Sequence, residues 1–300
     1  MVGSASDTTA VVEEFASQGF VRLERALPRE LCEEVAAGAF DRLGMTGGPS
    51  EWPQGTVHLP VVRNWDLDEV SPSAWDAAVA LVGDADLIRF AGVQDNLIVN
   101  FPTKDRPWWP AEDWASGAMG WHKDGDWFRH FLDSPEQALL VIVFWRDVVH
   151  HQGPTYVAVD SIAGVAQLLA EHPEGLDPSS VLDAVPGILS ECHDFRELTG
   201  TQGDIVLAHP FMLHTASVNV TDQPRIISNS SIMLSSPIDL ATPLDETAPL
   251  PASILEALGA DRLDFEATGS RRKVESERER RWAAEQAAPQ GNSGDPVSDG

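Results

Sequence analysis

The chain of 300 residues is poor in cysteine and contains no long apolar run. Its two cysteines, Cys32 and Cys192, lie far apart, so we expect reduced thiols rather than a disulfide framework. No stretch of about 18 consecutive apolar residues occurs, which argues against a transmembrane helix. Residues Met1 to Val11 lack the basic start and apolar core of a secretory signal. Together these absences predict a cytoplasmic protein.

Positive charge is also scarce, because 20 Lys and Arg residues face 47 Asp and Glu residues, giving a formal net charge of -27. Nucleic-acid binding requires a basic surface, and anionic membranes attract basic segments, so both classes of partner are disfavoured. The acidic balance itself indicates solubility. A small-molecule partner is the remaining expectation, and the sequence indicates no oligomeric state.

The order of the predicted elements favours a mainly β fold. A helix, a short strand and a second helix are expected between about Thr8 and Leu43, and further helices at Ser71 to Val82 and Ile162 to Leu169. Later segments read as short strands: Val93 to Phe101, Ala138 to Trp145, Thr155 to Val159, Ile205 to Ala208, Phe211 to Val218 and Arg225 to Leu234. This order predicts a β-sandwich or jelly roll with helical buttresses rather than alternating βαβ units.

The remaining segments carry weaker patterns. Residues 45–60 and 102–120 are rich in Gly, Pro or Trp and are expected to be loops, and Leu255 to Leu263 a short helix. Ser270 to Ala287 is highly charged and is expected to be helical, and Pro289 to Gly300 has the composition of a disordered tail. We therefore expect one domain over residues 1–268 and a charged, partly disordered tail over residues 269–300.

His122 and Asp124 form the most informative pair in the sequence. Side chains alternate across an extended strand, so two residues separated by one other point to the same side and reach one ion. Imidazole and carboxylate together suit Fe(II), and a second histidine would complete a 2-His-1-carboxylate set that leaves other coordination positions open. By itself this short motif is weak, because a turn with a chance histidine looks the same.

A second segment supplies the candidates for the remaining ligand. The apolar stretch that begins at Gly203 leads to His209 and then to His214, and Arg225 follows after a further turn. From the residues alone either histidine is available. The permanently charged guanidinium of Arg225 is suited to bind a carboxylate through two parallel hydrogen bonds. These residues indicate an iron oxygenase with an acidic cosubstrate.

Four motifs in this order resemble the phytanoyl-CoA dioxygenase-like family of Fe(II)- and 2-oxoglutarate-dependent oxygenases. They are Phe15 to Leu23 with Leu27 to Cys32, Trp121 to Gly125, Gln152 to Thr155, and Gly203 to His214 followed by Asn219 and Arg225. The resemblance implies a double-stranded β-helix, a cupin-like jelly roll with the metal in its mouth. The sequence departs from the family after the distal histidine, where Thr215 and Ala216 precede Ser217.

The resemblance also implies roles for individual residues. His122, Asp124 and His214 would bind iron, which leaves His209 in the core or beside the site, and Arg225 would bind the distal carboxylate of 2-oxoglutarate. A polar residue before the metal motif commonly contacts this cosubstrate. Asn96 and Asn100 are candidates because they are expected on one strand face, and Ser217 is a third; a structural role for the two asparagines is equally compatible.

The implied chemistry is the hydroxylation of an unactivated C–H bond of a small metabolite by O2, coupled to decarboxylation of 2-oxoglutarate to succinate. Asp124 fills the position that a halogenase leaves open for halide, so oxygen transfer is favoured over halogenation. Desaturation, epimerisation and ring formation use the same ligands and stay open. Two other classes are a non-catalytic jelly-roll binding protein and a cupin-like metalloenzyme without 2-oxoglutarate; Arg225 argues against both.

Aromatic residues cluster around the metal motif. Trp108, Trp121, Trp127 and Phe128 are candidates for lining a substrate pocket, and ordinary packing of hydrophobic loops explains them equally well. If they line a pocket, the substrate is apolar or carries a ring.

Overall fold

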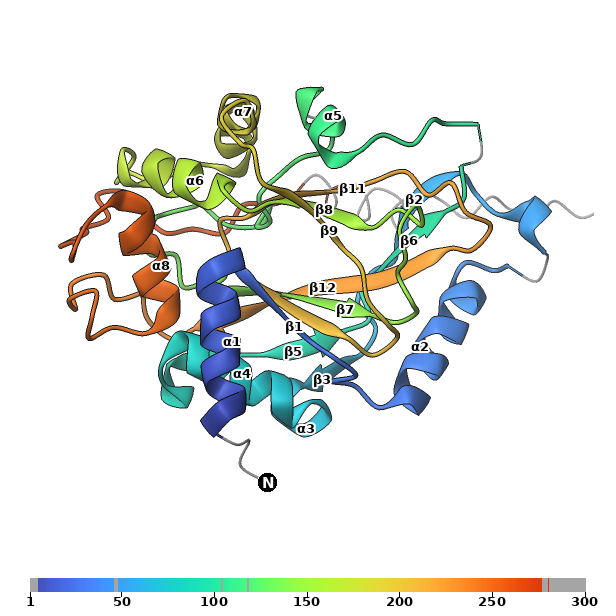
Figure 1. Cartoon of the computed structure of the whole chain (residues 1–300), viewed down its shortest axis with the longest axis horizontal. Coiled ribbons are helices and arrows are strands. Elements are labelled where there is room, and N and C mark those ends of the chain that lie inside the picture. The colour runs from blue at the N-terminus through green and yellow to red at the C-terminus, as the bar shows by residue number, and fades with distance from the viewer. Residues whose placement is uncertain (1–4, 46–47, 104, 118, 277–279, 281–300) are drawn as a thin grey trace, which may run out of the picture.

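Two antiparallel sheets lie against each other, with the smaller sheet above the larger one in Figure 1. The computed structural model describes residues 5–45, 48–103, 105–117, 119–276 and 280. The large sheet has the strand order β1 (Phe20–Leu23), β10 (Ile205–Ala208), β7 (Leu139–Phe144), β12 (Arg225–Leu234), β6 (Leu97–Phe101) and β2 (Gly55–His58), with β4 (Ile88–Phe90) paired to β12. The small sheet has the order β11 (Leu213–Ala216), β8 (Thr155–Ala158) and β9 (Phe195–Leu198). A separate ribbon joins β3 (Asn64–Asp66) to β5 (Gly92–Gln94).

The path of the chain alternates between the two sheets. Strand β6 belongs to the large sheet, and a bridge between His122 and His214 then adds the next segment to the edge of the small sheet. The chain returns to the large sheet at β7, β10 and β12, and to the small sheet at β8, β9 and β11. This winding is that of a double-stranded β-helix, so the predicted jelly-roll fold class is confirmed.

Strand β7 explains how the core is divided. All six of its residues are buried, as its uninterrupted apolar sequence predicts for a strand covered on both faces. Leu139, Val141 and Val143 pack with the helices in one hydrophobic cluster, and Leu140 and Ile142 pack between the sheets in a second cluster. Strand β7 therefore contributes to the core on both of its faces.

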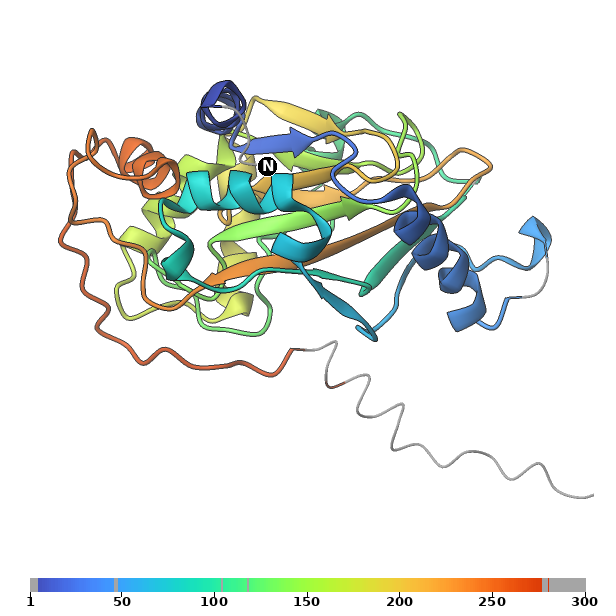
Figure 2. The same ribbon diagram turned by 90° about the horizontal axis from the view of Figure 1, so that it is seen from below.

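Helices cover the outer face of the large sheet and the end of the barrel. In Figure 1, α1 (Ala5–Gln18), α3 (Leu67–Val70) and α4 (Pro72–Val82) lie on the outer side of the large sheet, and Figure 2 shows α4 from that side. The others are α2 (Arg29–Arg42), α5 (Ala111–Ser116), α6 (Ser161–Ala170), α7 (Pro178–Leu189), α8 (Pro249–Leu258), and the 3-10 turns η1 (Pro49–Glu51) and η2 (Ala85–Leu87). Within the described part of the chain, every helix is too short or too polar to cross a membrane.

Several expected elements differ from the structure. The strand expected over residues 93–101 is split into β5 and β6, with Asp95 and Asn96 between them. Both expected loops contain regular structure, since β2 lies within residues 45–60 and α5 within residues 102–120. The helix expected over residues 255–263 begins earlier, as α8, and ends at Leu258, where Gly259 adopts a left-handed conformation.

The segment over residues 270–276 is extended, so the helix expected from Ser270 is wrong for this part. It lies beside residues 127–129, which follow His122 and Asp124 in the sequence. Val274 N donates to Trp127 O at 2.8 Å, and Arg129 N donates to Arg272 O at 3.1 Å. Apart from residue 280, the rest of the predicted tail lies outside the described residues. The domain limits 1–268 and 269–300 stay predictions.

Candidate metal centre and anion site

Three side chains converge at the edge of the small sheet. One ligand atom from each of His122, Asp124 and His214 lies within 4.8 Å of the others. Oδ1 of Asp124 is 3.3 Å from Nε2 of His122 and 3.6 Å from Nε2 of His214. The bridge between the two histidine backbones holds them side by side, which brings residues far apart in the sequence to one point.

Backbone carbonyls orient both imidazole rings toward this point. Nδ1 of His122 is 2.7 Å from Gly120 O, and Nδ1 of His214 is 3.2 Å from Met212 O. A carbonyl oxygen only accepts hydrogen bonds, so each Nδ1 is the donor in these contacts, and Nε2 is the ring nitrogen directed toward a metal ion. Nε2 of His214 is buried without a hydrogen-bond partner, so the site contains an orphaned acceptor.

The charges of the three groups reinforce one another. Burial by itself would raise the pKa of Asp124, but His214 and His122 hold it well below the usual value. Burial opposes protonation of His122, yet the adjacent Asp124 raises its pKa. A cation at this point would take the place of that proton, because the carboxylate keeps its negative charge.

Lys123 points away from the triad, as alternation along an extended segment requires. Its Nζ is buried between His130 Nδ1, at 3.1 Å, and Gln137 Oε1, at 3.4 Å, and burial lowers the pKa of Lys123 to about 7. Gly125 follows with a φ of +113°, where a Cβ would lie 2.5 Å from the ring of Phe128. The turn after Asp124 therefore requires glycine.

Arg225 is the second unusual group of the site. Its side chain is almost completely buried, Nη1 donates to Thr155 Oγ1 at 3.1 Å, and Nε has no partner. Burial lowers the pKa of Arg225 to about 10, and no salt bridge to it is formed within the described part of the chain. A buried cation without a counter-ion is costly, so its surroundings favour an anionic ligand.

The triad and Arg225 line one cavity of about 400 Å³, which we call the Arg225 cavity. Its walls come from both sheets: Ile98, Ile142 and Ile227 belong to the large sheet, and Thr155 and Ala216 to the small sheet. Apolar side chains thus line the same cavity as a metal-ligand set and a buried guanidinium. This arrangement suits a small molecule with a metal-chelating end and a distal carboxylate.

The three other cosubstrate candidates lie away from this cavity or are already engaged. Asn100 Nδ2 donates to Ser217 O at 2.8 Å, and Ser217 Oγ donates to Pro154 O at 2.7 Å, so both bind backbone. Asn96 precedes β6 and donates to Asn229 O at 2.6 Å. Because the strand breaks at Asp95, Asn96 lies outside β6, and it lines a different cavity from Arg225; its contact with the cosubstrate stays a prediction.

Two residues that bind site side chains, Thr155 and Asn229, were not predicted from the sequence. Thr155 belonged to a recognised turn motif but was given no role, although it is the hydrogen-bond partner of Arg225. Asn229 Nδ2 donates to Asp124 Oδ2 at 2.7 Å. Alternation along β12 places Asn229 on the same strand face as Arg225, which is the signal that points to it.

The four aromatic candidates have different surroundings. Trp121 and Phe128 are each 1% exposed, Trp121 against Phe195 and Phe128 against His130. They are core residues, which corrects the expectation that they line a pocket. Trp108 packs edge-on against the ring of His151, and of the four only Trp127 lines a cavity next to the triad.

That second cavity, of about 510 Å³, lies on the other side of Asp124 and is called the Asn96 cavity here. Its lining is mixed: neutral hydrogen-bonding side chains, Gln94, Asn96, Gln137, Asn229, Ser230 and Ser231, lie beside the apolar Val61, Phe90, Trp127, Leu140 and Met233 and the charged Arg89 and Asp126. Asp124 and Asn229 line both cavities and so lie at the boundary between them.

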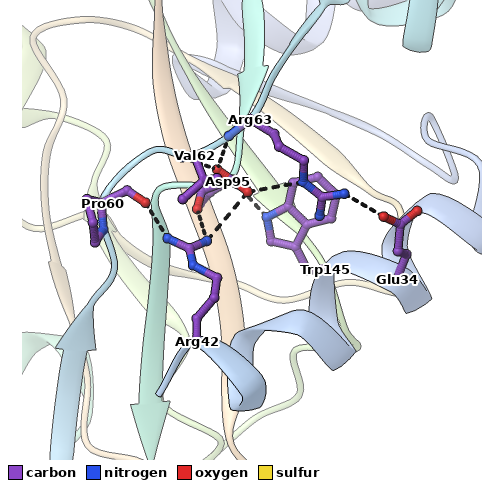
Figure 3. Close-up of polar contacts among 8 residues, drawn as sticks. Glu34, Arg42, Pro60, Val62, Arg63, Asp95 and Trp145 are labelled. Atoms are coloured by element: carbon purple, nitrogen blue, oxygen red, sulfur yellow. Dashed lines mark hydrogen bonds and ion pairs between the residues drawn. The ribbon is translucent and has the colours of Figure 1, made fainter. Parts of the chain in front are cut away.

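The buried carboxylate of Asp95, between the cavity-lining residues Gln94 and Asn96, makes the polar contacts drawn in Figure 3. Oδ1 of Asp95 accepts hydrogen bonds from the backbone of Val62 and Arg63, both at 2.7 Å. Oδ2 is 3.3 Å from Arg63 Nε and 3.5 Å from Arg42 Nη1. Asp95 thereby ties the turn that carries Gln94 and Asn96 to the segment before β3 and to α2.

No family model matches this sequence, and no curated protein matches it. Among solved structures the chain is similar to the non-heme alpha ketoglutarate dependent carbocyclase SnoK from nogalamycin biosynthesis, with 14% identity over 76% of this chain and 84% of that chain and a TM-score of 0.46. The epimerase SnoN, in complex with Fe3+, alpha ketoglutarate and nogalamycin RO, gives 16% identity, 77% and 84% coverage and a TM-score of 0.46. EvdO2 from Micromonospora carbonacea var. aurantiaca, complexed with 2-oxoglutarate, gives 16% identity, 84% and 98% coverage and a TM-score of 0.42.

Proposed function

We propose that the protein is a non-haem Fe(II)- and 2-oxoglutarate-dependent oxygenase of the phytanoyl-CoA dioxygenase-like kind. One observation carries the proposal: a 2-His-1-carboxylate set and a buried guanidinium without a counter-ion line the same cavity. The first group suits Fe(II), and the second suits the distal carboxylate of a dicarboxylic acid. The donor set itself fits this metal, because two imidazole nitrogens and one carboxylate oxygen converge on one point.

In this proposal His122, Asp124 and His214 hold the iron, and Arg225 with Thr155 holds the far carboxylate of 2-oxoglutarate. Bound iron would supply the activation of O2. The isoleucine side chains of the Arg225 cavity exclude water around the cosubstrate and so strengthen the electrostatic contacts within it. The balanced reaction consumes a C–H substrate, 2-oxoglutarate and O2, and yields the hydroxylated product, succinate and CO2.

The substrate in this proposal is a small polar molecule that occupies the Asn96 cavity. Gln94 and Ser231 offer neutral hydrogen-bonding groups there, and Trp127 offers an aromatic face. Arg89 offers a cation, whose Nη2 donates to Sδ of Met233. This lining favours a ring or chain that carries hydroxyl or amide groups over a purely apolar molecule. Desaturation, epimerisation and ring formation on such a substrate use the same residues, so product analysis decides among them.

Anaerobic titration with Fe(II) and then 2-oxoglutarate tests the assignment. We expect a weak visible charge-transfer band that His214→Ala abolishes. Arg225→Ala should raise the 2-oxoglutarate concentration required for the band far more than it weakens iron binding. Absence of the band in the parent protein, with iron shown to be bound, rules out the 2-oxoglutarate assignment, and equal loss of both ligands in Arg225→Ala points to a structural arginine. Succinate release across a panel of polar metabolites then identifies the substrate.

A further inference from the structure

The two oxygens of Asp124 have different surroundings. Oδ1 faces the Nε2 atoms of His122 and His214, at 3.3 Å and 3.6 Å. Oδ2 accepts a hydrogen bond of 2.7 Å from Nδ2 of Asn229. One oxygen is therefore directed to the point where a metal would bind, and the other is held away from it.

The fold fixes Asn229 from two sides. Its backbone is in the ladder of β12, opposite Ile142 of β7, and its carbonyl accepts a hydrogen bond of 2.6 Å from Asn96 Nδ2. Arg225, Ile227 and Asn229 alternate onto one face of β12, and all three line the Arg225 cavity. Strand β12 thus presents Arg225 for an anionic ligand and Asn229 for the metal-binding carboxylate of Asp124. The two residues are about 13 Å apart along the strand, at about 3.3 Å per residue.

We propose that Asn229 is a positioning residue that keeps Asp124 a ligand through one oxygen only. This inference rests on the proposed function, because it concerns the metal that the triad would hold. An amide donor suits this task, since it aligns the carboxylate without neutralising its charge, whereas a lysine or arginine in the same place would compete with the metal.

The coordination number gives this role a chemical consequence. An octahedral ion that binds two histidines and one carboxylate oxygen keeps three positions, which a chelating keto acid and O2 would fill. If Oδ2 were released, Asp124 would lose its fixed orientation toward the ion, which weakens binding, and Oδ2 would be free to occupy one of those positions. Loss of Asn229 is therefore expected to alter the metal site itself, not only the rate of reaction.

Co(II), a spectroscopic substitute for Fe(II), provides a readout that is independent of activity. Asn229→Leu removes the donor and nearly preserves the size of the side chain. We expect the Kd for Co(II) to rise roughly 10- to 100-fold, as for other loss of hydrogen bonds to metal ligands, and the visible d–d spectrum to change. Asn229→Gln retains a donor and should restore part of the affinity.

Ser231→Ala is the matched control, because Ser231 lies two residues further along β12 and binds Gln137 rather than Asp124. It should retain the Co(II) affinity and spectrum of the parent. Asn229→Ala serves if the leucine variant does not fold, and thermal unfolding of each metal-free variant checks this. Co(II) affinity within twofold of the parent and an unchanged spectrum, in a folded variant without the donor, overturn the proposal.

The experiment separates this inference from the proposed function. If the parent does not bind Co(II), or if His214→Ala binds it equally well, the proposed metal centre itself is wrong. If the parent binds Co(II) and 2-oxoglutarate normally and Asn229→Leu is indistinguishable from it, only the role of Asn229 is wrong.

Discussion

Arg225 and Thr155 connect the two sheets inside the barrel: Nη1 of Arg225 on β12 donates to Oγ1 of Thr155 on β8 at 3.1 Å. Both residues line the Arg225 cavity. The hydroxyl accepts a hydrogen bond from a buried guanidinium whose Nε has no partner. Its removal should therefore affect ligand binding through the orientation of Arg225.

Thr155→Val replaces the hydroxyl with a methyl group of similar size. We expect the Kd for 2-oxoglutarate to rise about tenfold, because one hydrogen bond to a charged group contributes about 1.5 kcal/mol. Thr155→Ser retains the hydroxyl and should remain close to the parent. Calorimetric titration of the anaerobic metal-loaded protein measures both. Equal weakening by valine and serine would assign Thr155 a packing role instead.

Arg225→Met should have opposite effects on binding and on stability. The substitution removes a buried cation that has no counter-ion, so the free energy of unfolding of the ligand-free protein should increase by about 1–3 kcal/mol. The variant should also lose the stabilisation by 2-oxoglutarate, which for the parent is about 2.7 kcal/mol at a hundredfold excess over Kd. Urea unfolding with and without 2-oxoglutarate measures both effects. A destabilised ligand-free variant would contradict this account.

Local pattern in the sequence was sufficient to predict several of the strands and the common side of His122 and Asp124. Alternation predicts that His122 and Asp124 point to one side with Lys123 opposite, and the continuous apolar sequence of β7 predicts burial on both faces. These features depend only on neighbouring residues, so they are readable without a structure.

Features that depend on contacts between residues far apart in the sequence could not be predicted from it. The break between β5 and β6 occurs because Asp95 binds the backbone of residues 62 and 63 and the side chain of Arg42, and no local pattern reports those partners. For the same reason Asn96 was expected on one continuous strand with Asn100, whereas it precedes β6. The extended segment 270–276 was predicted to be helical because its charge pattern gave no sign of its pairing with residues 127–129.

Asp95→Asn tests whether this buried carboxylate stabilises the fold. The substitution keeps an acceptor for the backbone of Val62 and Arg63 but removes the charge that faces Arg42 and Arg63 (Figure 3). We expect the free energy of unfolding to fall by about 2 kcal/mol. This is less than the roughly 3–5 kcal/mol typical of breaking a fully buried ion pair, because both arginines are partly exposed. Glu34→Gln, at the exposed end of the same network, should cost under about 1 kcal/mol. Urea unfolding compares the two, and equal costs would refute the role of Asp95.

His209 should make the protein less stable in mild acid. The side chain is 1% exposed, Nδ1 accepts a hydrogen bond from Phe211 N at 3.0 Å, and Nε2 has no partner. Burial, aided by the charge of Lys123, lowers the pKa of His209 to about 3. Between that value and the usual pKa of about 6.5, the unfolded chain binds a proton that the folded protein does not.

The sign of the effect follows from this difference in proton binding. Stability is unaffected by His209 above about pH 6.5 and falls by about 1.4 kcal/mol per pH unit below it, or about 2 kcal/mol at pH 5. His209→Asn keeps an acceptor for Phe211 N but does not titrate, so the difference in unfolding free energy between about pH 7.5 and pH 5 should shrink by that amount. His130, whose pKa burial also lowers, should maintain a residual pH dependence in the variant. An unchanged difference would mean that His209 does not stay neutral in the folded protein.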